Sequence, residues 1–157
     1  VGLSLNDASG KTWVGFHADP YERSFRLVRM HLLLPTGEPL NSTSVLRAFA
    51  AGHAFIGFDL LGETTGFRFI ATNGNEQKIQ GDEIALGNGV NLSVGVPVAA
   101  RVVLLRDGRV FREETGVKEK DYGVTEKGIY RVEVYLPQLP GPVGAQPWII
   151  SNPIYVR

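Results

Sequence analysis

Apolar and polar side chains alternate along much of the second half of the chain. The alternation is clearest over residues 91–96 and 128–136, and it is typical of strands with one buried face. Apolar runs bounded by Gly, Pro, Asn or Asp predict further strands over 28–34, 53–60, 67–71, 77–86, 101–106, 109–113, 147–150 and 153–156. Short strands joined by tight turns, with no long helix between them, favour a β-sandwich.

Two local signals refine this prediction. Asp107-Gly108 separates two apolar runs, and this dipeptide favours a type I′ hairpin because both central residues need positive φ. Tyr130 follows a turn near the start of its strand, where the tyrosine corner of Greek-key sandwiches lies, although an ordinary strand aromatic is the alternative. We therefore predict an immunoglobulin-like antiparallel β-sandwich over residues 63–157.

The first third of the chain predicts a small α+β segment with one or two short helices. Residues 19–22 supply a capping Asp, a Pro and a Glu in helix-start order, which predicts a helix over about 20–26. The serine or threonine at positions 42 and 43 is expected to cap a second helix over about 43–51. Gly52 then ends that helix, because the residue after a helix often has a left-handed backbone.

Composition limits the partners that we expect. The 157 residues suit one domain, or one domain and a small appendage. Sixteen basic and sixteen acidic side chains balance, so no net charge favours nucleic acid or an anionic membrane. No apolar run approaches the roughly 20 residues of a membrane span. The sequence has no cysteine, which excludes disulfides, thiolate metal sites and thiol nucleophiles.

The histidines give only weak candidates for chemistry. His17 and Asp19 could both ligate a metal, but a metal site needs three or four ligands. His53 directly follows the second predicted helix, and His31 lies inside an apolar strand, so we expect structural roles for both. The sequence therefore predicts no catalytic, cofactor-binding or metal-binding residue and no cofactor in this chain.

Three aromatic residues could instead stack a ligand. Trp13 and Tyr21 precede the first predicted helix, and Trp148 lies in the last predicted strand. A row of exposed aromatic rings on a sandwich could bind sugars. Burial in the core or at a domain contact is the favoured interpretation, because large aromatic side chains are usually buried.

Three segments resemble the C-terminal part of bacterial PHP-domain proteins, which are metal-dependent phosphoesterase-like hydrolases. The segments cover residues 19–29, 45–59 and 147–156. The resemblance implies that residues 1–62 are the tail of a PHP-type barrel and that 63–157 form an appended sandwich. The metal-binding His-x-His and Asp-x-His motifs of the family do not occur here. The resemblance thus places the chemistry upstream of Val1, and no ligand can be transferred to this chain.

Three hypotheses for function follow, in order of preference. The first is a non-catalytic accessory region of a PHP-type hydrolase, with a structural or substrate-positioning role. The second is a stand-alone module that binds carbohydrate or another polymer, and the third is a small metal-dependent hydrolase that uses His17 and Asp19.

The first hypothesis also predicts what covers the apolar segments. Because the chain lacks an initiator Met, we expect a processed chain or an excised piece of a soluble bacterial protein, with export left as an open alternative. The apolar segments 32–34 and 55–58 would then contact the missing upstream barrel, or would drive self-association.

Overall fold

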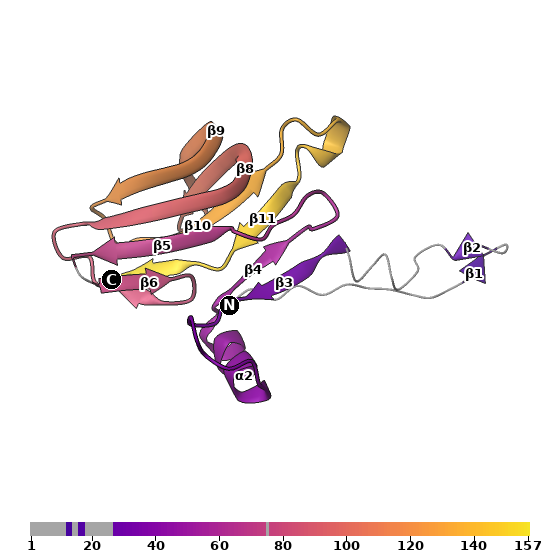
Figure 1. Ribbon diagram of the computed structural model, residues 1–157. Coiled ribbons are helices and arrows are strands. Elements are labelled where there is room, and N and C mark those ends of the chain that lie inside the picture. Colours follow the sequence, from indigo (N-terminus) through magenta and orange to yellow (C-terminus); the bar gives the residue numbers. More distant parts are fainter. Residues whose placement is uncertain (1–11, 14–15, 18–26, 75) are drawn as a thin grey trace.

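The computed structural model describes residues 12–13, 16–17, 27–74 and 76–157, and this part of the chain is mainly β with one α-helix (Figure 1). In chain order the elements are β1 (Thr12–Trp13), β2 (Phe16–His17), β3 (Arg29–Leu32), α2 (Ser42–Ala51), β4 (Ala54–Gly57), β5 (Arg68–Asn73), β6 (Glu76–Ile79), β7 (Glu83–Ile84), β8 (Val90–Arg106), β9 (Arg109–Val124), β10 (Gly128–Tyr135), the 3₁₀ turn η1 (Gly141–Val143), β11 (Pro147–Ser151) and β12 (Ile154–Val156). The predicted mainly β class is confirmed, whereas the helix predicted over 20–26 lies outside the described residues.

Ten of these strands form one curled sheet, and β1 pairs only with β2. The sheet order is β3-β4-β11-β10-β8-β5-β6, with β9 on β8 and with β12 bridging β10 and β7. The pairs are antiparallel except for β7 with β12. Strands β3 and β4, from the predicted barrel tail, pair with each other, and β4 also pairs with β11 near the end of the chain. The predicted boundary near residue 62 therefore falls in a connection within one sheet.

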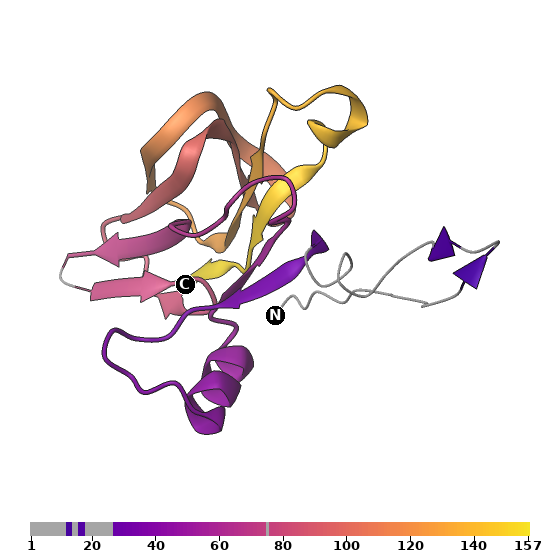
Figure 2. The same cartoon turned by 45° about the vertical axis from the view of Figure 1, so that its right-hand side comes forward.

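The curl comes from the long β8–β9 hairpin. Val124 lies opposite Val90 at one end of β8, and Tyr130 lies opposite Arg106 at the other end. A straight strand of this length would span about 55 Å, whereas the short link from β9 to β10 reaches roughly 20 Å. The two ends of β8 must therefore lie close together, and Figure 2 shows the hairpin arching over the sheet.

The inside of the curl holds the core. Both halves of β8 contribute to it, with Leu92 and Val94 from the first half and Val102 and Leu104 from the second, all fully buried. The bend lies between Gly95 and Ala100, where the register with β9 shifts, as at a β-bulge. We predicted two separate strands here, and the structure has one continuous bent strand.

The two local signals are confirmed. Asp107 and Gly108 have φ of 51° and 79°, as a type I′ turn requires. The Tyr130 hydroxyl donates to the backbone oxygen of Glu126 at 2.8 Å, and its buried ring meets the edge of Phe111. This bond fixes the turn that carries the chain from one side of β8 to the other.

Helix α2 begins one residue earlier than we predicted. Asn41 is the N-cap in place of Ser42 or Thr43, because its side-chain oxygen accepts from the Ser44 amide while the Ser44 hydroxyl accepts from the Asn41 amide. Gly52 ends the helix with φ of 73°, as expected. Among the described residues, no helix has the length and apolar character needed to cross a membrane.

Candidate functional site

Of the weak candidates near the N-terminus, the structure describes only the backbone of Trp13 and His17. Trp13 and His17 belong to the small β1–β2 pair, in which Trp13 lies opposite Phe16. The side chains of Trp13 and His17, and the whole of Asp19 and Tyr21, lie outside the described part of the structure.

His53 forms a two-residue contact. Its Nε2 lies 2.7 Å from Oδ1 of Asp82, and both side chains are partly buried. The pair joins the end of α2 to the turn between β6 and β7. Within the described ranges, no group of three or more His, Cys, Asp or Glu side chains is placed to hold a metal ion.

Trp148 is a core residue and is therefore removed from the candidates for stacking a ligand. It is 1% exposed, and its indole N–H donates to the backbone oxygen of Gly62 at 3.0 Å. A buried ring with its polar atom already bonded offers no free face to a sugar. The preferred interpretation of Trp148 as a core aromatic is therefore confirmed.

Sequence inspection missed a polar cluster around His31. The Nε2 atom of His31 lies 3.1 and 3.2 Å from the Asp59 carboxylate oxygens and 3.0 Å from the Thr64 hydroxyl oxygen. Thr64 also donates to Asp59, and Arg29 contacts the same carboxylate at 3.3 Å. Gly57 leaves the space for this cluster, since a Cβ there would lie 2.7 Å from the Thr64 hydroxyl.

This cluster lacks the geometry of a nucleophilic triad. In a triad, the carboxylate and the hydroxyl bond to opposite nitrogens of the imidazole. Here Asp59 and Thr64 both contact Nε2 of His31, and Thr64 donates to the carboxylate while being completely buried. The cluster therefore ties β3 to the connection after β4, and it activates no hydroxyl.

A third feature is a groove beside the His53–Asp82 pair. It has a volume of about 480 Å³, and its walls include Leu33, Phe67 and Phe69. The amide of Gln80, which also contributes to the groove, is completely buried and has no hydrogen-bond partner among the described residues.

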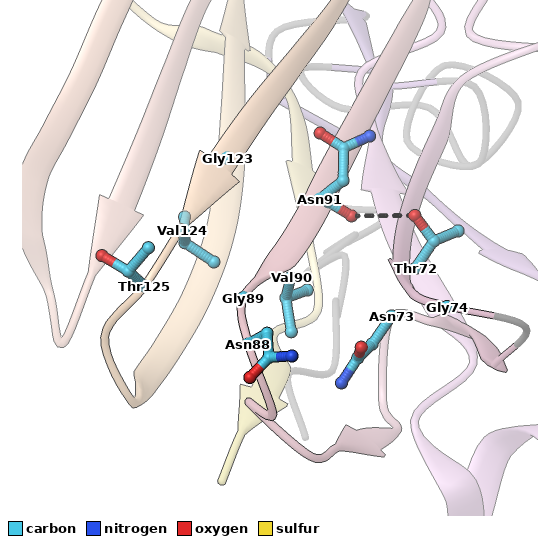
Figure 3. A pocket seen from close by; sticks show the side chains of 10 residues that line it. All are labelled: Thr72, Asn73, Gly74, Asn88, Gly89, Val90, Asn91, Gly123, Val124 and Thr125. Carbon is cyan, nitrogen blue, oxygen red and sulfur yellow. Dashed lines mark hydrogen bonds between the residues drawn. The ribbon is translucent and has the colours of Figure 1, made fainter.

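A hollow lined only by uncharged residues lies at one end of β5, β8 and β9 (Figure 3). It has a volume of about 500 Å³. Three segments build it, with 72–74 on one side, 88–91 in the middle and 123–125 on the other side. Its lining residues are all uncharged: Thr72, Asn73, Gly74, Asn88, Gly89, Val90, Asn91, Gly123, Val124 and Thr125.

Strand register explains why these residues meet. Thr72 lies opposite Asn91, and Asn91 lies opposite Gly123, so the three form one row across β5, β8 and β9. The strand neighbours Ala71, Val90, Leu92, Tyr122 and Val124 are core residues, which places the row on the outer face. A Cβ built at Gly123 would have no atom within 4 Å, so the row ends in open space.

Glycines in the turns complete the hollow. Gly87 has φ of 51°, and a Cβ there would lie 2.8 Å from Nδ2 of Asn73, so glycine permits this close approach. The same Nδ2 donates to the backbone oxygen of Ala85 at 2.7 Å, which fixes the Asn73 side chain.

The perturbed ionisable groups lie elsewhere. Burial raises the pKa of Tyr122 to about 12, with a smaller contribution from the charge of Glu114. Burial likewise raises the pKa of Tyr135 to about 12, and its hydrogen bond to Glu133 adds to the effect. Hydrogen bonds from Thr65 lower the pKa of Glu63. None of the residues that line the hollow has a titratable side chain.

Comparison with known proteins gives no match, whether to a family model, a curated protein or a solved structure.

Proposed function

We propose that this chain is a non-catalytic accessory region of a larger hydrolase of the PHP type, and that it docks on the rest of that protein through α2. The observation that carries the proposal is the orientation of this helix. Leu46 is 65% exposed and Phe49 is 39% exposed, whereas the buried residues of the helix are Ser44 and Ala48. Leu40, just before the helix, is 80% exposed.

This orientation is the reverse of that of an ordinary surface helix. Such a helix buries its large apolar side chains and exposes its polar ones. Here Leu46 and Phe49 face outward, and the buried face is made of small side chains. Contiguous exposed apolar residues mark contact surfaces in soluble proteins. A partner domain that covers Leu40, Leu46 and Phe49 would give the helix its missing apolar contact.

The neighbouring strand β3 offers a second contact element. Within the described sheet, β3 pairs only with β4. The Leu33 amide bonds to the oxygen of His53, and hydrogen-bonded positions alternate along an antiparallel pair. Backbone groups of Met30 and Leu32 therefore point to the open edge, where another strand could add to the sheet.

The resemblance to PHP-type proteins concentrates at this same corner. The similar segments 45–59 and 147–156 are far apart in sequence, but β4 and β11 within them are paired neighbours. The third segment, 19–29, leads into β3, the next strand. We interpret the corner formed by β3, β4 and α2 as the surface on which the barrel of the larger protein docks.

The structure changes which apolar residues we assign to docking. Of the predicted segments 32–34 and 55–58, Phe55 is buried and Leu33 and Phe58 pack against the core. We therefore assign the contact to Leu40, Leu46 and Phe49. We also retain the immunoglobulin-like sandwich as part of the proposal, supported by the facing halves of β8 and by the Tyr130 hydrogen bond.

The proposal is tested by comparing amide hydrogen exchange in the 157-residue chain with that in the longer native protein. The open reading frame around Val1 would be sequenced, and the longer protein would be compared with the 157-residue chain. We expect α2 to exchange more slowly in the longer protein, with no change in the β8–β9 hairpin, which serves as the internal reference. Replacing Leu46 and Phe49 by Ser in the longer protein should restore fast exchange, whereas the matched Val110→Ser, at an exposed position on β9, should not. A native chain that starts near Val1, or equal exchange of α2 in both proteins, would overturn the proposal.

A further inference from the structure

We propose that the hollow at the end of β5, β8 and β9 binds the neutral, hydroxyl-rich units of a carbohydrate. The hollow shares no residue with α2 or β3, so this inference stands apart from the docking proposal. Its volume of about 500 Å³ lies within the range of small-molecule sites.

The hydrogen-bonding groups of the hollow match a sugar. Each asparagine amide offers two N–H donors and a carbonyl acceptor, and a sugar hydroxyl can both donate and accept. Asn88 has no hydrogen-bond partner in the described structure, and its side chain lies beside the hollow in Figure 3. Asn73 is held through its Nδ2, which leaves its carbonyl oxygen for a ligand. The site thus combines one preorganised amide with one available amide.

The absence of charge in the lining selects against other ligands. A phosphate or carboxylate site uses Arg, Lys or a helix N-terminus, and a calcium site uses several carboxylates. The lining residues supply only amides, hydroxyls, backbone groups and two valine side chains. Val90 and Val124 are each 2% exposed, so their side chains belong to the core beneath the hollow and the surface that meets a ligand is polar. A neutral polyhydroxylated ligand fits this combination best.

A second hollow extends the surface toward a longer ligand. It shares Thr72 with the first hollow, and its volume is about 580 Å³. Ser93 and Asp121, the next row on the same face, line it together with the Arg68–Glu119 ion pair. The ligand class that we assign is therefore an oligosaccharide that continues from the neutral hollow along the outer face of β5, β8 and β9.

Gly123 makes the inference testable without loss of the fold. Its backbone is compatible with other residues, and a side chain there would point into open space. Gly123→Val should fill the hollow while favouring the strand, because β-branched residues suit strands. The control is Thr115→Val, an exposed position on the same strand outside the hollow. Thermal unfolding of both variants would show that the fold is retained.

Binding would be followed by NMR on the side-chain amide signals of Asn73, Asn88 and Asn91. The probes are cellotetraose, maltotetraose, xylotetraose, mannotetraose and tetra-N-acetylchitotetraose, with inorganic phosphate and calcium chloride as charged comparisons. We expect at least one oligosaccharide to give saturable shifts. Asn88→Ala should weaken binding about two- to tenfold, the effect of losing one hydrogen bond. Gly123→Val should weaken it by about tenfold or more, and Thr115→Val should leave it unchanged.

Three outcomes would overturn the assignment. The first is that none of the five oligosaccharides shifts the amide signals. The second is that Gly123→Val binds as well as the parent chain. The third is that phosphate or calcium, and no sugar, shifts these signals, which would show that the hollow is a site for ions.

Discussion

The body of the curled sheet and the corner formed by β3, β4 and α2 differ most at α2, whose large apolar side chains face outward, whereas Phe55 of β4 lies in the core. In the body, Leu92 and Leu104 from the two halves of β8 meet in one closed core. In the corner, Leu46 and Phe49 face outward, and the inner contacts include a polar cluster around His31. The body thus buries its large apolar side chains, whereas α2 in the corner leaves two of them exposed.

The two regions are joined by strand pairing and by Phe55 of β4, which packs against Phe67 with ring centroids 5.0 Å apart. Strands β4 and β11 pair directly, and the Asn152 side chain donates to the backbone oxygen of Gly52 at 2.9 Å. The turn at Gly81 packs so closely on the end of α2 that a Cβ would overlap the backbone there, 2.7 Å from the carbonyl carbon of Gly52. Such a junction holds the corner in a defined position without burying the apolar face of α2.

The largest effect that separates the regions should come from one leucine substitution in each. Leu104→Ala removes a completely buried side chain, and we expect it to lower the free energy of unfolding by about 2–5 kcal/mol, through lost burial and a residual cavity. Leu46→Ala on α2 should change it by less than about 0.5 kcal/mol in the 157-residue chain. Urea unfolding of both variants measures the difference. Equal losses would show that α2 packs as part of the core.

The junction should give the next largest effect. Gly81 has φ of 99°, and a Cβ there would overlap the backbone of Ala51 and Gly52. We expect Gly81→Ala to cost more than about 2 kcal/mol, because left-handed strain and steric overlap add. Gly37 provides the matched control, since it has φ of 84° and no atom within 4 Å of a Cβ.

Gly37→Ala should therefore cost only the strain, about 1–2 kcal/mol. Both variants would be compared by urea unfolding, and hydrogen exchange of α2 and β4 would show whether the corner detaches. If the two substitutions cost the same, close packing at Gly81 is not what holds the corner in place.

A smaller effect on stability is expected from the Tyr130 hydrogen bond, which fixes the turn before β10. Tyr130→Phe removes the bond to the backbone oxygen of Glu126 and leaves the ring packing intact. We expect a loss of about 1 kcal/mol, the usual contribution of one such bond. The measurement is the urea midpoint at unchanged slope. A neutral result would mean that the turn before β10 is held by its other contacts.

Local signals in the sequence predicted the parts of the fold that depend on neighbouring residues. Asp107-Gly108, Tyr130 and Gly52 each act within a few positions, and all three behave as predicted. Pro97, by contrast, argues for a strand break, yet it lies at the bend of one continuous strand. A bulge and a break have the same sequence signal, so the length of β8 could not be predicted.

Long-range pairing explains what was missed at the sites. The partners around His31 are 28 and 33 positions away, and only the β3–β4 pairing and the return of the chain after β4 bring them together. The hollow likewise collects Asn73 from the end of β5, Asn88 from the turn before β8 and Gly123 from the end of β9. Its one available signal is a glycine within a strand, which often marks a close approach of another group.

The smallest effect on stability at neutral pH should come from the substitution Tyr122→Phe. The contribution of Tyr122 to stability should become measurable at alkaline pH. Its ring is buried, and its hydroxyl has no hydrogen-bond partner in the described structure. Tyr122→Phe should therefore be neutral or slightly stabilising at pH 7, in contrast to Tyr130→Phe, because no bond is lost.

Burial raises the pKa of Tyr122 to about 12 in the folded chain, whereas the unfolded value is near 10. The folded state therefore holds this proton more tightly, so its contribution to stability is complete below about pH 10 and is lost as the pH rises from about 10 to 12. Urea unfolding across this range should show stability falling more steeply in the parent than in Tyr122→Phe. Parallel curves would mean that water reaches the hydroxyl, and that the curled sheet is less closed at this end than its core indicates.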